Sequence, residues 1–200
     1  HTGEPAVSAS QMQEEYLNST GHGVTPLLNF APNQQGLIDD DAVAKLTEFK
    51  AWVDRIHAND LARQPGVKTT DTGHRGNASQ YAAAMATDGN AETYFATDDK
   101  VTTAVIEVEL GKVQQPAGFI IQEYIPLGQR VDGYAIECRV DGQWQPVFSG
   151  KKIGYKRIIF AGRSSARDLK LPACDAVRLR IDNSLACPLI NNFQIIGTEP

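Results

Sequence analysis

Two hundred residues provide room for one domain, or for a domain and part of another, but not for a complete (β/α)8 barrel of about 250 residues with an appended module. Hydrophobic residues make up 42% of the chain and charged residues 22%, which excludes disordered and membrane-spanning proteins. The net charge of −5, without a dense basic cluster, argues against nucleic acid as a partner. No apolar run reaches the roughly 20 residues of a membrane span. Because the chain opens on His1 without an initiator Met, we expect it to have been cut from a longer protein.

Residues 1–62 show the succession of helix and strand signals that is typical of an α/β fold. Ser8 or Ser10 can cap a short first helix. The apolar run at residues 24–30 then predicts a strand buried on both faces, as in a parallel sheet. Three aspartates at 39–41 place negative charge on the first turn of the next helix, where the helix dipole favours it. That helix has apolar residues along one stripe, namely Val43, Leu46, Phe49, Val53 and Ile56. One such unit cannot bury its own faces, so we expect it to belong to a larger α/β body.

The spacing of apolar residues changes from 3.6 to 2 after about residue 59. Residues 61–80, rich in Gly, Pro and Thr, predict a linker or an irregular loop. Beyond them, short alternating segments indicate strands, and Asp141-Gly142 is a hairpin turn signal. Strands are expected at 104–110, 118–124, 134–140, 144–148, 157–160, 176–181 and 192–196. Roughly eight strands without a long helix predict an all-β sandwich of the jelly-roll type, so we place a domain boundary between residues 1–62 and 63–200.

The three cysteines carry little chemical signal. Cys138 lies on the apolar face of a predicted strand, as a small buried hydrophobe. Cys174 and Cys187 flank another strand, whose two ends would have to meet before a disulfide could form. None has the His or Asp spacing of a zinc site or a thiol nucleophile, which favours three inert thiols.

Several motifs, in the same order, resemble family-29 α-L-fucosidases. Residues 27–38, which begin LLNFAPN, and the helix at 43–49 are similar to the end of the catalytic barrel in that family. The segments 122–131 and 153–157 are similar to parts of its C-terminal sandwich. Residues 88–93 resemble the opening of discoidin-type (coagulation-factor type C) and related carbohydrate-binding sandwiches. The resemblance implies a galactose-binding-like jelly roll preceded by an α/β fragment of a (β/α)8 barrel.

The resemblance also implies a retaining exo-glycosidase that removes terminal α-1,3- or α-1,4-linked L-fucose from glycans and needs no cofactor for catalysis. Retaining enzymes use two carboxyl groups about 5–5.5 Å apart, in this family an Asp and a Glu, and neither motif is present in the chain. Glu14 and Glu15 are adjacent on a helix and point about 100° apart, so they cannot flank one bond. We interpret them as a solvated helix face. We expect no catalytic residue in this chain, and no activity without the rest of the barrel.

Asn29 is the candidate for the periphery of the substrate pocket. Barrel enzymes build their sites at the C-terminal ends of strands, where Asn29 would lie if residues 24–30 form the last barrel strand. The alternative is that its side chain caps the turn that follows. His22, between two glycines before this run, is interpreted as a turn residue.

The loop at residues 88–93 combines oxygen-bearing side chains with a glycine turn. The resemblance implies a structural Ca²⁺ here, with Asp88 and Thr93 as ligands and Glu199 near the C-terminus completing the site. The alternative is a turn held by Asx hydrogen bonds, and we favour it slightly because only Asp88 is a firm charged ligand.

Aromatic side chains raise the question of whether the sandwich binds sugar, and the candidates are Tyr94, Phe95, Tyr124, Trp144 and Tyr155. Trp144 follows a hairpin turn and is expected to pack in the core. Glu123, Gln129 and Arg130 lie in a segment with Pro and Gly, which is typical of a loop. We expect this segment to dock the sandwich onto the barrel, with Arg130 pairing with a barrel carboxylate.

The preferred hypothesis is part of an α-L-fucosidase, whose partners are fucosylated glycans and the rest of the barrel, in the same polypeptide or in a companion chain. The alternative is a non-catalytic carbohydrate-binding module, which would have no use for the strand and helix within residues 11–58. A glycan substrate implies a secreted, periplasmic or cell-surface location.

Overall fold

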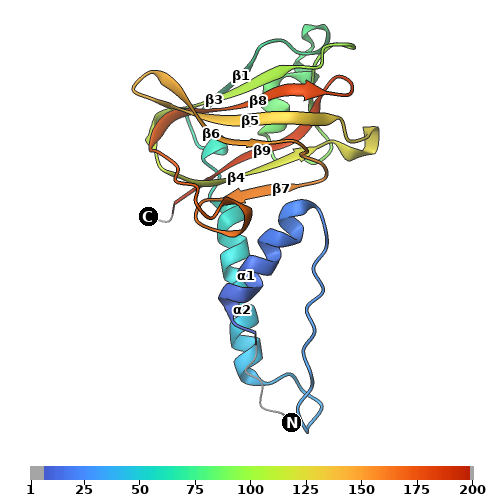
Figure 1. The fold of residues 1–200 in the computed structure, drawn as a ribbon, viewed down its shortest axis with the longest axis vertical. Coiled ribbons are helices and arrows are strands. Elements are labelled where there is room, and N and C mark those ends of the chain that lie inside the picture. Colours follow the sequence, from blue (N-terminus) through green and yellow to red (C-terminus); the bar gives the residue numbers. More distant parts are fainter. Residues whose placement is uncertain (1–6, 199–200) are drawn as a thin grey trace.

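The computed structural model describes residues 7–198 and shows a β-sandwich from which two helices and an extended segment project (Figure 1). The helices are α1 (Ala9–Asn18) and α2 (Asp40–Ala58), and the short 3-10 turns used below are η1 (Thr20–His22), η2 (Leu61–Arg63) and η6 (Ile125–Leu127). The strands are β1 (Lys68–Asp71), β2 (Phe95–Ala96), β3 (Ala104–Gln114), β4 (Pro116–Glu123), β5 (Val131–Val140), β6 (Gln143–Gly150), β7 (Arg157–Phe160), β8 (Cys174–Ser184) and β9 (Leu189–Gly197). No helix in the described part of the chain is long and apolar enough to cross a membrane.

Two antiparallel sheets face each other in the sandwich. One has the strand order β1-β3-β8-β5-β6 and the other β2-β9-β4-β7. Strand β3 illustrates why the layers form, because Ile106 and Val108 are fully buried whereas Glu107 and Glu109 on the opposite side are only partly covered. The largest buried side chains from the two sheets include Tyr134, Phe95, Phe119 and Phe193. The predicted all-β sandwich is therefore confirmed.

All seven strands expected from alternation are formed, and the hairpin turn is confirmed. Asp141 and Gly142 have φ values of 50° and 75°, as a two-residue turn between right-twisted strands requires. The expectation for Trp144 is wrong. Its ring lies on the outer face of the five-stranded sheet, over the guanidinium groups of Arg139 at 5.6 Å and Arg178 at 4.3 Å. Its register partner on β5 is Arg139, which faces outward, so Trp144 is directed away from the core.

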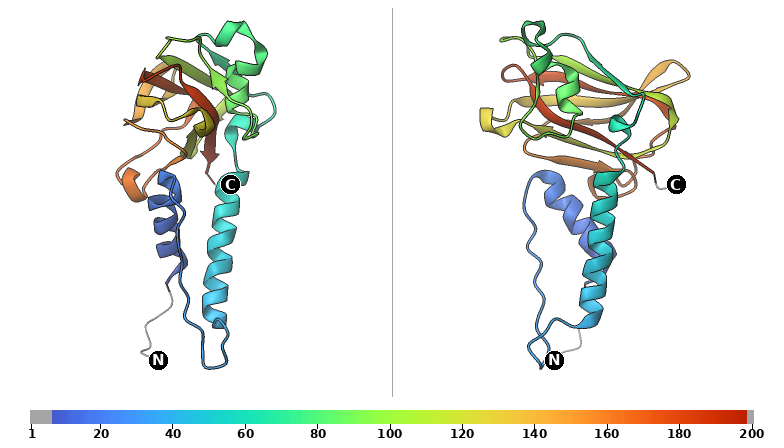
Figure 2. Two further views of the ribbon diagram at one scale, coloured as in Figure 1. Left: turned by 90° about the vertical axis from the view of Figure 1, so that its right-hand side faces the viewer. Right: turned by 180° about the vertical axis from the view of Figure 1, so that it is seen from behind.

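Residues 7–60 form a projection that we call the stalk (Figure 2). In α1, Ser8 caps the helix through a reciprocal capping box with Gln11, as one of the two expected serines. The extended segment runs from η1 to the tip of the stalk, where the chain turns back into α2. The base of the stalk packs on the outer face of the four-stranded sheet through an apolar cluster of Leu17, Trp52, Ile56, Ile120, Ile158 and Ile196.

The expected strand at residues 24–30 is not formed, and the α/β barrel fragment is not seen in this chain. The segment is extended, but it belongs to neither sheet. The physical reason is that a strand exists only through hydrogen bonds to a neighbour, and the described residues provide none beside it. Helix α2, in contrast, begins at the predicted acidic cluster and has Trp52 and Ile56 on its buried side.

Candidate functional site

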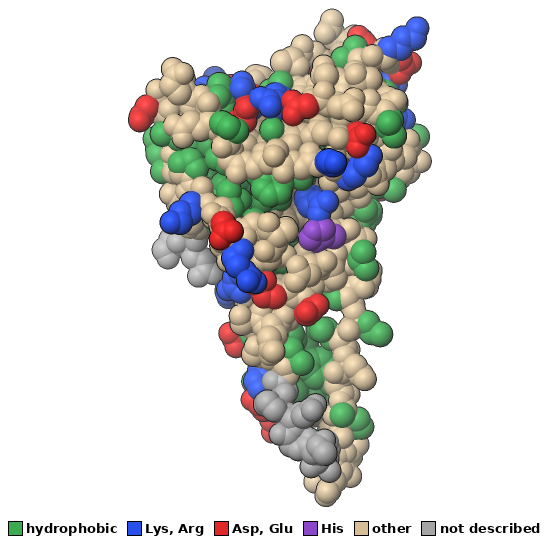
Figure 3. Space-filling model, in the orientation of Figure 1, with side chains coloured by type: hydrophobic (Ala, Val, Ile, Leu, Met, Phe, Trp, Pro, Cys, Tyr) green, Lys and Arg blue, Asp and Glu red, His purple; other side chains and the backbone are tan. Residues whose placement is uncertain are grey.

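The extended segment presents apolar side chains to solvent. Leu27 is 95% exposed, Val24 61% and Leu37 65%. Side chains along the segment alternate, because Pro26, Leu28 and Phe30 are partly covered while Leu27 and Asn29 point outward. Hydrophobic side chains gather along this part of the stalk in Figure 3. A contiguous apolar stripe of this kind indicates a surface that another protein segment covers.

The backbone of the segment is also unpaired. Within residues 25–32, no N–H or C=O group of the described structure takes part in a backbone hydrogen bond. Pairing resumes at Asn33, whose N–H donates to the carbonyl of Leu37 at 2.7 Å and whose side chain accepts from the N–H groups of Gln35 and Leu37. An extended backbone with free donors and acceptors is a template for pairing with a further strand.

Asn29 lies exposed on the outward side of this segment and lines a groove of about 470 Å³ between the segment and α1. Glu14 and Glu15 line the same groove. Only Glu15 fits the interpretation of a solvated face, because the Glu14 carboxylate contacts Arg163 at 3.4 Å and the N–H of Ser164 at 3.1 Å. The interpretation of Glu14 as solvated is thus wrong, since this carboxylate joins α1 to the loop after β7.

The C-terminal end of α2 is held by strand β9. Gln194 is 4% exposed, and its amide donates to the carbonyls of Ile56 at 2.8 Å and His57 at 3.2 Å. These carbonyls belong to the last turn of the helix, where no intrahelical donor reaches them. Asp60, directly after the helix, accepts from the N–H groups of Ala62 at 2.9 Å and Ile195 at 3.1 Å. The stalk is therefore anchored by directed hydrogen bonds as well as by apolar packing.

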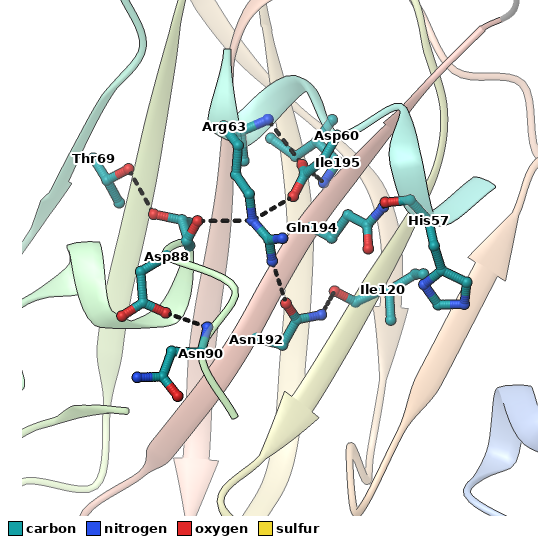
Figure 4. A network of polar contacts seen from close by, with 12 residues as sticks. His57, Asp60, Arg63, Thr69, Asp88, Asn90, Ile120, Asn192, Gln194 and Ile195 are labelled. Carbon is teal, nitrogen blue, oxygen red and sulfur yellow. Dashed lines mark hydrogen bonds and ion pairs between the residues drawn. The ribbon is translucent and has the colours of Figure 1, made fainter. Parts of the chain in front are cut away.

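Arg63 connects this anchor to the loop at residues 85–93 (Figure 4). Its guanidinium contacts the Asp60 carboxylate at 3.1 Å, the carbonyl of Thr87 at 3.1 Å and the side chain of Asn192 at 3.3 Å. Asn192 in turn donates to the carbonyl of Ile120 on β4. One arginine thus links the end of α2, the loop and two strands.

Burial shifts several pKa values at this junction. Burial raises the pKa of Asp60 above its ordinary value, although hydrogen bonds from Ala62 and Ile195 and the charge of Arg63 oppose the shift. Burial and the charge of Lys156 lower the pKa of His57, and Asp54 opposes this. His57 Nε2 lies 2.9 Å from the Tyr16 hydroxyl, whose pKa burial raises. The pair therefore joins α1 to α2 as two neutral groups at pH 7.

The loop at residues 88–93 contains the Asx turn that was weighed against a metal site. The N–H of Asn90 donates to Asp88 Oδ1 at 2.8 Å, and the N–H of Glu92 donates to Asn90 Oδ1 at 3.0 Å. The Thr93 hydroxyl contacts Asp88 Oδ2 at 2.6 Å, the carbonyl of Asn90 at 3.0 Å and that of Met85 at 3.5 Å. These converging oxygens are hard donors of the kind that Ca²⁺ prefers.

Only one of those donors is a carboxylate. Within residues 7–198, no cluster of three or more His, Cys, Asp or Glu side chains could hold a metal ion. Glu199 lies outside the described residues. The Asx turn is present, and the Ca²⁺ site stays a prediction.

Glu123 and Arg130 are used within the sandwich. The Glu123 carboxylate is 2% exposed and accepts from the N–H groups of Arg130 at 2.7 Å, Val131 at 2.8 Å and Gly154 at 2.8 Å. The Arg130 guanidinium donates to the carbonyl of Cys187 at 2.9 Å and contacts its Sγ at 2.8 Å. Gln129 is exposed beside Gly154. The three residues thus lie together and connect loops within the sandwich, and their role in docking stays a prediction.

Sequence reasoning missed Arg63 and Gln194. Both lie near predicted element boundaries, but their partners are up to 138 residues away, so no local pattern reveals them. Gly89 was the one available signal. A Cβ at this position would lie 2.4 Å from Arg63 Nη1, so the glycine permits the arginine to reach the loop.

A model of the F5/8 type C domain matches residues 67–185, which is more than half of the chain and includes most of both sheets. The chain belongs to the F5/8 type C domain family. The matched residues begin after the stalk, so the stalk lies outside this domain.

Comparisons over the whole chain extend beyond the F5/8 type C domain. Alpha-L-fucosidase 1 of Arabidopsis thaliana is 29% identical over 96% of this chain and 37% of its own length. The structure of a GH29 fucosidase of Ruminococcus gnavus in complex with fucose has a TM-score of 0.89 and 27% identity, covering 100% of this chain and 39% of that one. The chain therefore spans well under half of these relatives and is similar to their C-terminal portions.

A third structure matches the F5/8 type C domain without the stalk. The chitosan-binding module 1 from a Paenibacillus chitosanase/glucanase has a TM-score of 0.57 and 18% identity, covering 70% of this chain and 98% of that one. At this identity the likeness shows the fold alone. It indicates that the sandwich fold occurs as a separate unit.

Proposed function

We propose that this chain is the C-terminal part of an exo-α-L-fucosidase, in which the stalk completes the catalytic domain and the sandwich holds the stalk in place. The proposal includes a retaining mechanism and a preference for terminal α-1,3- and α-1,4-linked L-fucose. It also includes a secreted, periplasmic or cell-surface location, because such glycans are found there. The catalytic carboxylates belong to a part of the enzyme that this chain does not contain.

The observation that carries the proposal is the extended segment with its unpaired backbone at residues 25–32 and its exposed Leu27. Such a segment is costly to expose, but it suits a closed parallel barrel, where each strand pairs on both edges and is covered on both faces. The similarity to GH29 fucosidases along the entire chain, stalk included, supports this assignment.

The direction of the segment gives each part of the chain a role. It begins at the sandwich and ends at the tip of the stalk (Figure 2), and nine extended residues span about 30 Å. Barrel enzymes place their sites at the C-terminal ends of strands. The tip, which follows Asn29, would then border the substrate pocket, and the sandwich would act from a distance by fixing the position of α2.

The test compares this chain with a longer fucosidase that includes it, using an aryl α-L-fucoside. We expect no turnover by the 200-residue chain and turnover by the longer enzyme. Turnover by a preparation whose intact mass shows only this chain would refute the assignment of the carboxylates. NMR of the first-formed sugar in the longer enzyme tests retention, and an inverted anomer would contradict it.

The second candidate is a non-catalytic carbohydrate-binding module, which the fold of the sandwich allows. The stalk argues against it, because a free binding module gains nothing from an exposed apolar stripe. Glycan binding by the chain, combined with the absence of any hydrolytic partner sequence in the gene that encodes it, would favour this candidate instead.

A further inference from the structure

Strand β9 contains a bulge at Asn191. On the neighbouring strand β4, Gln122 pairs with Asn192 and the next residue, Glu123, pairs with Ile190. Asn191 is therefore an extra residue without a partner across the ladder. A bulge of this kind re-aims a side chain that would otherwise follow the alternation of the strand, and such bulges are frequent beside binding sites.

The Asn191 side chain is directed into a small hollow on the sandwich. The hollow has a volume of about 160 Å³ and is lined by Ala91 and Glu92 of the 88–93 loop, by Gln122 to Pro126, and by Tyr155 and Asn191. At about 30 Å³ for each water molecule, it has room for roughly five waters. This suits one sugar ring, and it is too small for a folded partner's surface.

The amide of Asn191 leaves an acceptor free in this hollow. Its Nδ2 donates to the carbonyl of Ala91 at 3.3 Å, which orients the group. Its Oδ1 is buried and has no hydrogen-bond partner among the described residues. A buried acceptor without a donor costs free energy, so the hollow favours a molecule that brings a hydroxyl or N–H group to this oxygen.

The remaining walls select for a flat, partly apolar molecule. Tyr155 is 61% exposed, and Tyr124 is held in place by stacking on Tyr94 with ring centroids 4.4 Å apart. The Gln122 amide donates to the carbonyl of Tyr155 at 3.1 Å, which fixes the Tyr155 backbone beside the hollow. Aromatic faces beside hydrogen-bonding groups match the apolar face and the hydroxyl edge of a pyranose.

We propose that this hollow, built around the bulged Asn191, is a binding site for a single neutral pyranose unit of a glycan. A hydroxyl of the sugar donates to Asn191 Oδ1, and its apolar face lies against Tyr155. The site is separate from the stalk segment that carries the proposed function, and it does not depend on catalysis.

The test is saturation-transfer NMR on the 200-residue chain with the methyl glycosides of D-glucose, D-galactose and L-fucose, and with glycerol as a negative control. We expect transfer to ring protons of at least one glycoside and none to glycerol. Asn191→Ala and Tyr155→Ala should each weaken binding about tenfold, as loss of one hydrogen bond or one stacked face implies. Val113→Ala, at a 68% exposed position outside the hollow, should leave binding unchanged.

Two controls keep the outcome decisive. Thermal unfolding of each variant establishes that it is folded, and Tyr155→Ala is informative even if Asn191→Ala is unstable, because Tyr155 is largely exposed. Absence of transfer to all three glycosides, or transfer that neither variant reduces, would overturn the proposal. Binding of glucosamine without binding of any neutral sugar would also overturn it, because the hollow would then recognise an ammonium group through Glu92.

Discussion

The guanidinium of Arg63 occupies the space that a side chain at position 89 would need. A Cβ built on Gly89 would lie 2.4 Å from Nη1 and 2.5 Å from Cζ of Arg63, and the residue has φ +80°. The glycine is therefore required twice, once for the left-handed backbone and once for the arginine that joins the loop to the base of the stalk.

Gly89→Ala should reduce the free energy of unfolding by about 2 kcal/mol, through backbone strain of about 1 kcal/mol and displacement of Arg63. Urea unfolding measures this. Gly36→Ala is the matched control, because Gly36 has φ +78° with nothing within 4 Å of its Cβ position, and it should show the strain alone. In an Arg63→Ala background the cost of Gly89→Ala should fall to that of the control. An equal cost with and without Arg63 would contradict the prediction.

His57 should make the chain less stable as the pH falls from 7 towards 5. Its pKa in the folded protein is lowered, chiefly by burial, whereas in the unfolded chain it returns to about 6.5. The unfolded state therefore binds a proton that the folded state does not, and stability decreases as pH falls below the unfolded value.

His57→Gln, which can keep a hydrogen bond to Tyr16, should flatten the pH dependence of the unfolding free energy over this range. His22→Gln, on an exposed residue, should leave it unchanged. Asp60, whose pKa is raised, contributes with the opposite sign and at lower pH, because its folded form binds the extra proton. An unchanged slope in His57→Gln would refute the assignment.

The predicted Ca²⁺ at the 88–93 loop can be tested through stability alone. If the converging oxygens of Asp88, Asn90, Thr93 and Met85 bind the ion, millimolar Ca²⁺ should raise Tm relative to EGTA, by mass action on the folded state. Asp88→Ala should abolish the increase, whereas Glu92→Ala, at an exposed position, should preserve it. Equal Tm values for the unchanged protein in Ca²⁺ and EGTA would count against the metal.

Leu27→Asp should have opposite consequences in the short chain and in a complete enzyme. In the 200-residue chain the side chain is 95% exposed, so the change should alter stability by less than about 0.5 kcal/mol. In a longer fucosidase in which the segment is a barrel strand, a buried aspartate should cost several kcal/mol and abolish activity. Leu185→Asp, at a 74% exposed position in the β8–β9 connection, should be neutral in both. Full activity of the longer Leu27→Asp enzyme would show that the segment does not become buried.

Glu123→Gln should be strongly destabilising although it preserves shape. The carboxylate accepts three backbone N–H groups, and an amide can offer them only one oxygen while directing its own N–H groups at donors. We expect a loss of about 2–3 kcal/mol in urea unfolding. Glu92→Gln is the exposed control and should change stability little. A loss below 0.5 kcal/mol for Glu123→Gln would contradict the role of its carboxylate in holding the two loops together.

The sandwich was predictable because its signal is local. Alternation along strands such as residues 104–110, together with a turn such as Asp141-Gly142, sets both the element and its buried face. The short strands β1 and β2 escaped, since four and two residues carry too little periodicity. Trp144 was placed wrongly because hydrophobicity was weighed above alternation, although its register partner Arg139 faces outward.

The junction and the stalk could be predicted only in part. Apolar spacing identified α2, and the run at residues 24–30 was correctly seen as apolar and extended. Whether such a run becomes a strand depends on a neighbour that the run itself does not encode. The contacts of Gln194 and Arg63 join residues more than 100 positions apart, so they follow from the assembled fold and not from any sequence window.

The capping of α2 by Gln194 has a consequence for the order of events during synthesis. Helices α1 and α2 leave the ribosome first, but the donor that closes the end of α2 and the apolar partner Ile196 lie on the last strand of the sandwich. The stalk can therefore form early as a loosely associated helix pair, and its direction is set only after β9 has entered its sheet. A nascent chain that stops before β9 would have both helices without a defined orientation, so the last strand acts as the final step that aligns the first fifty residues.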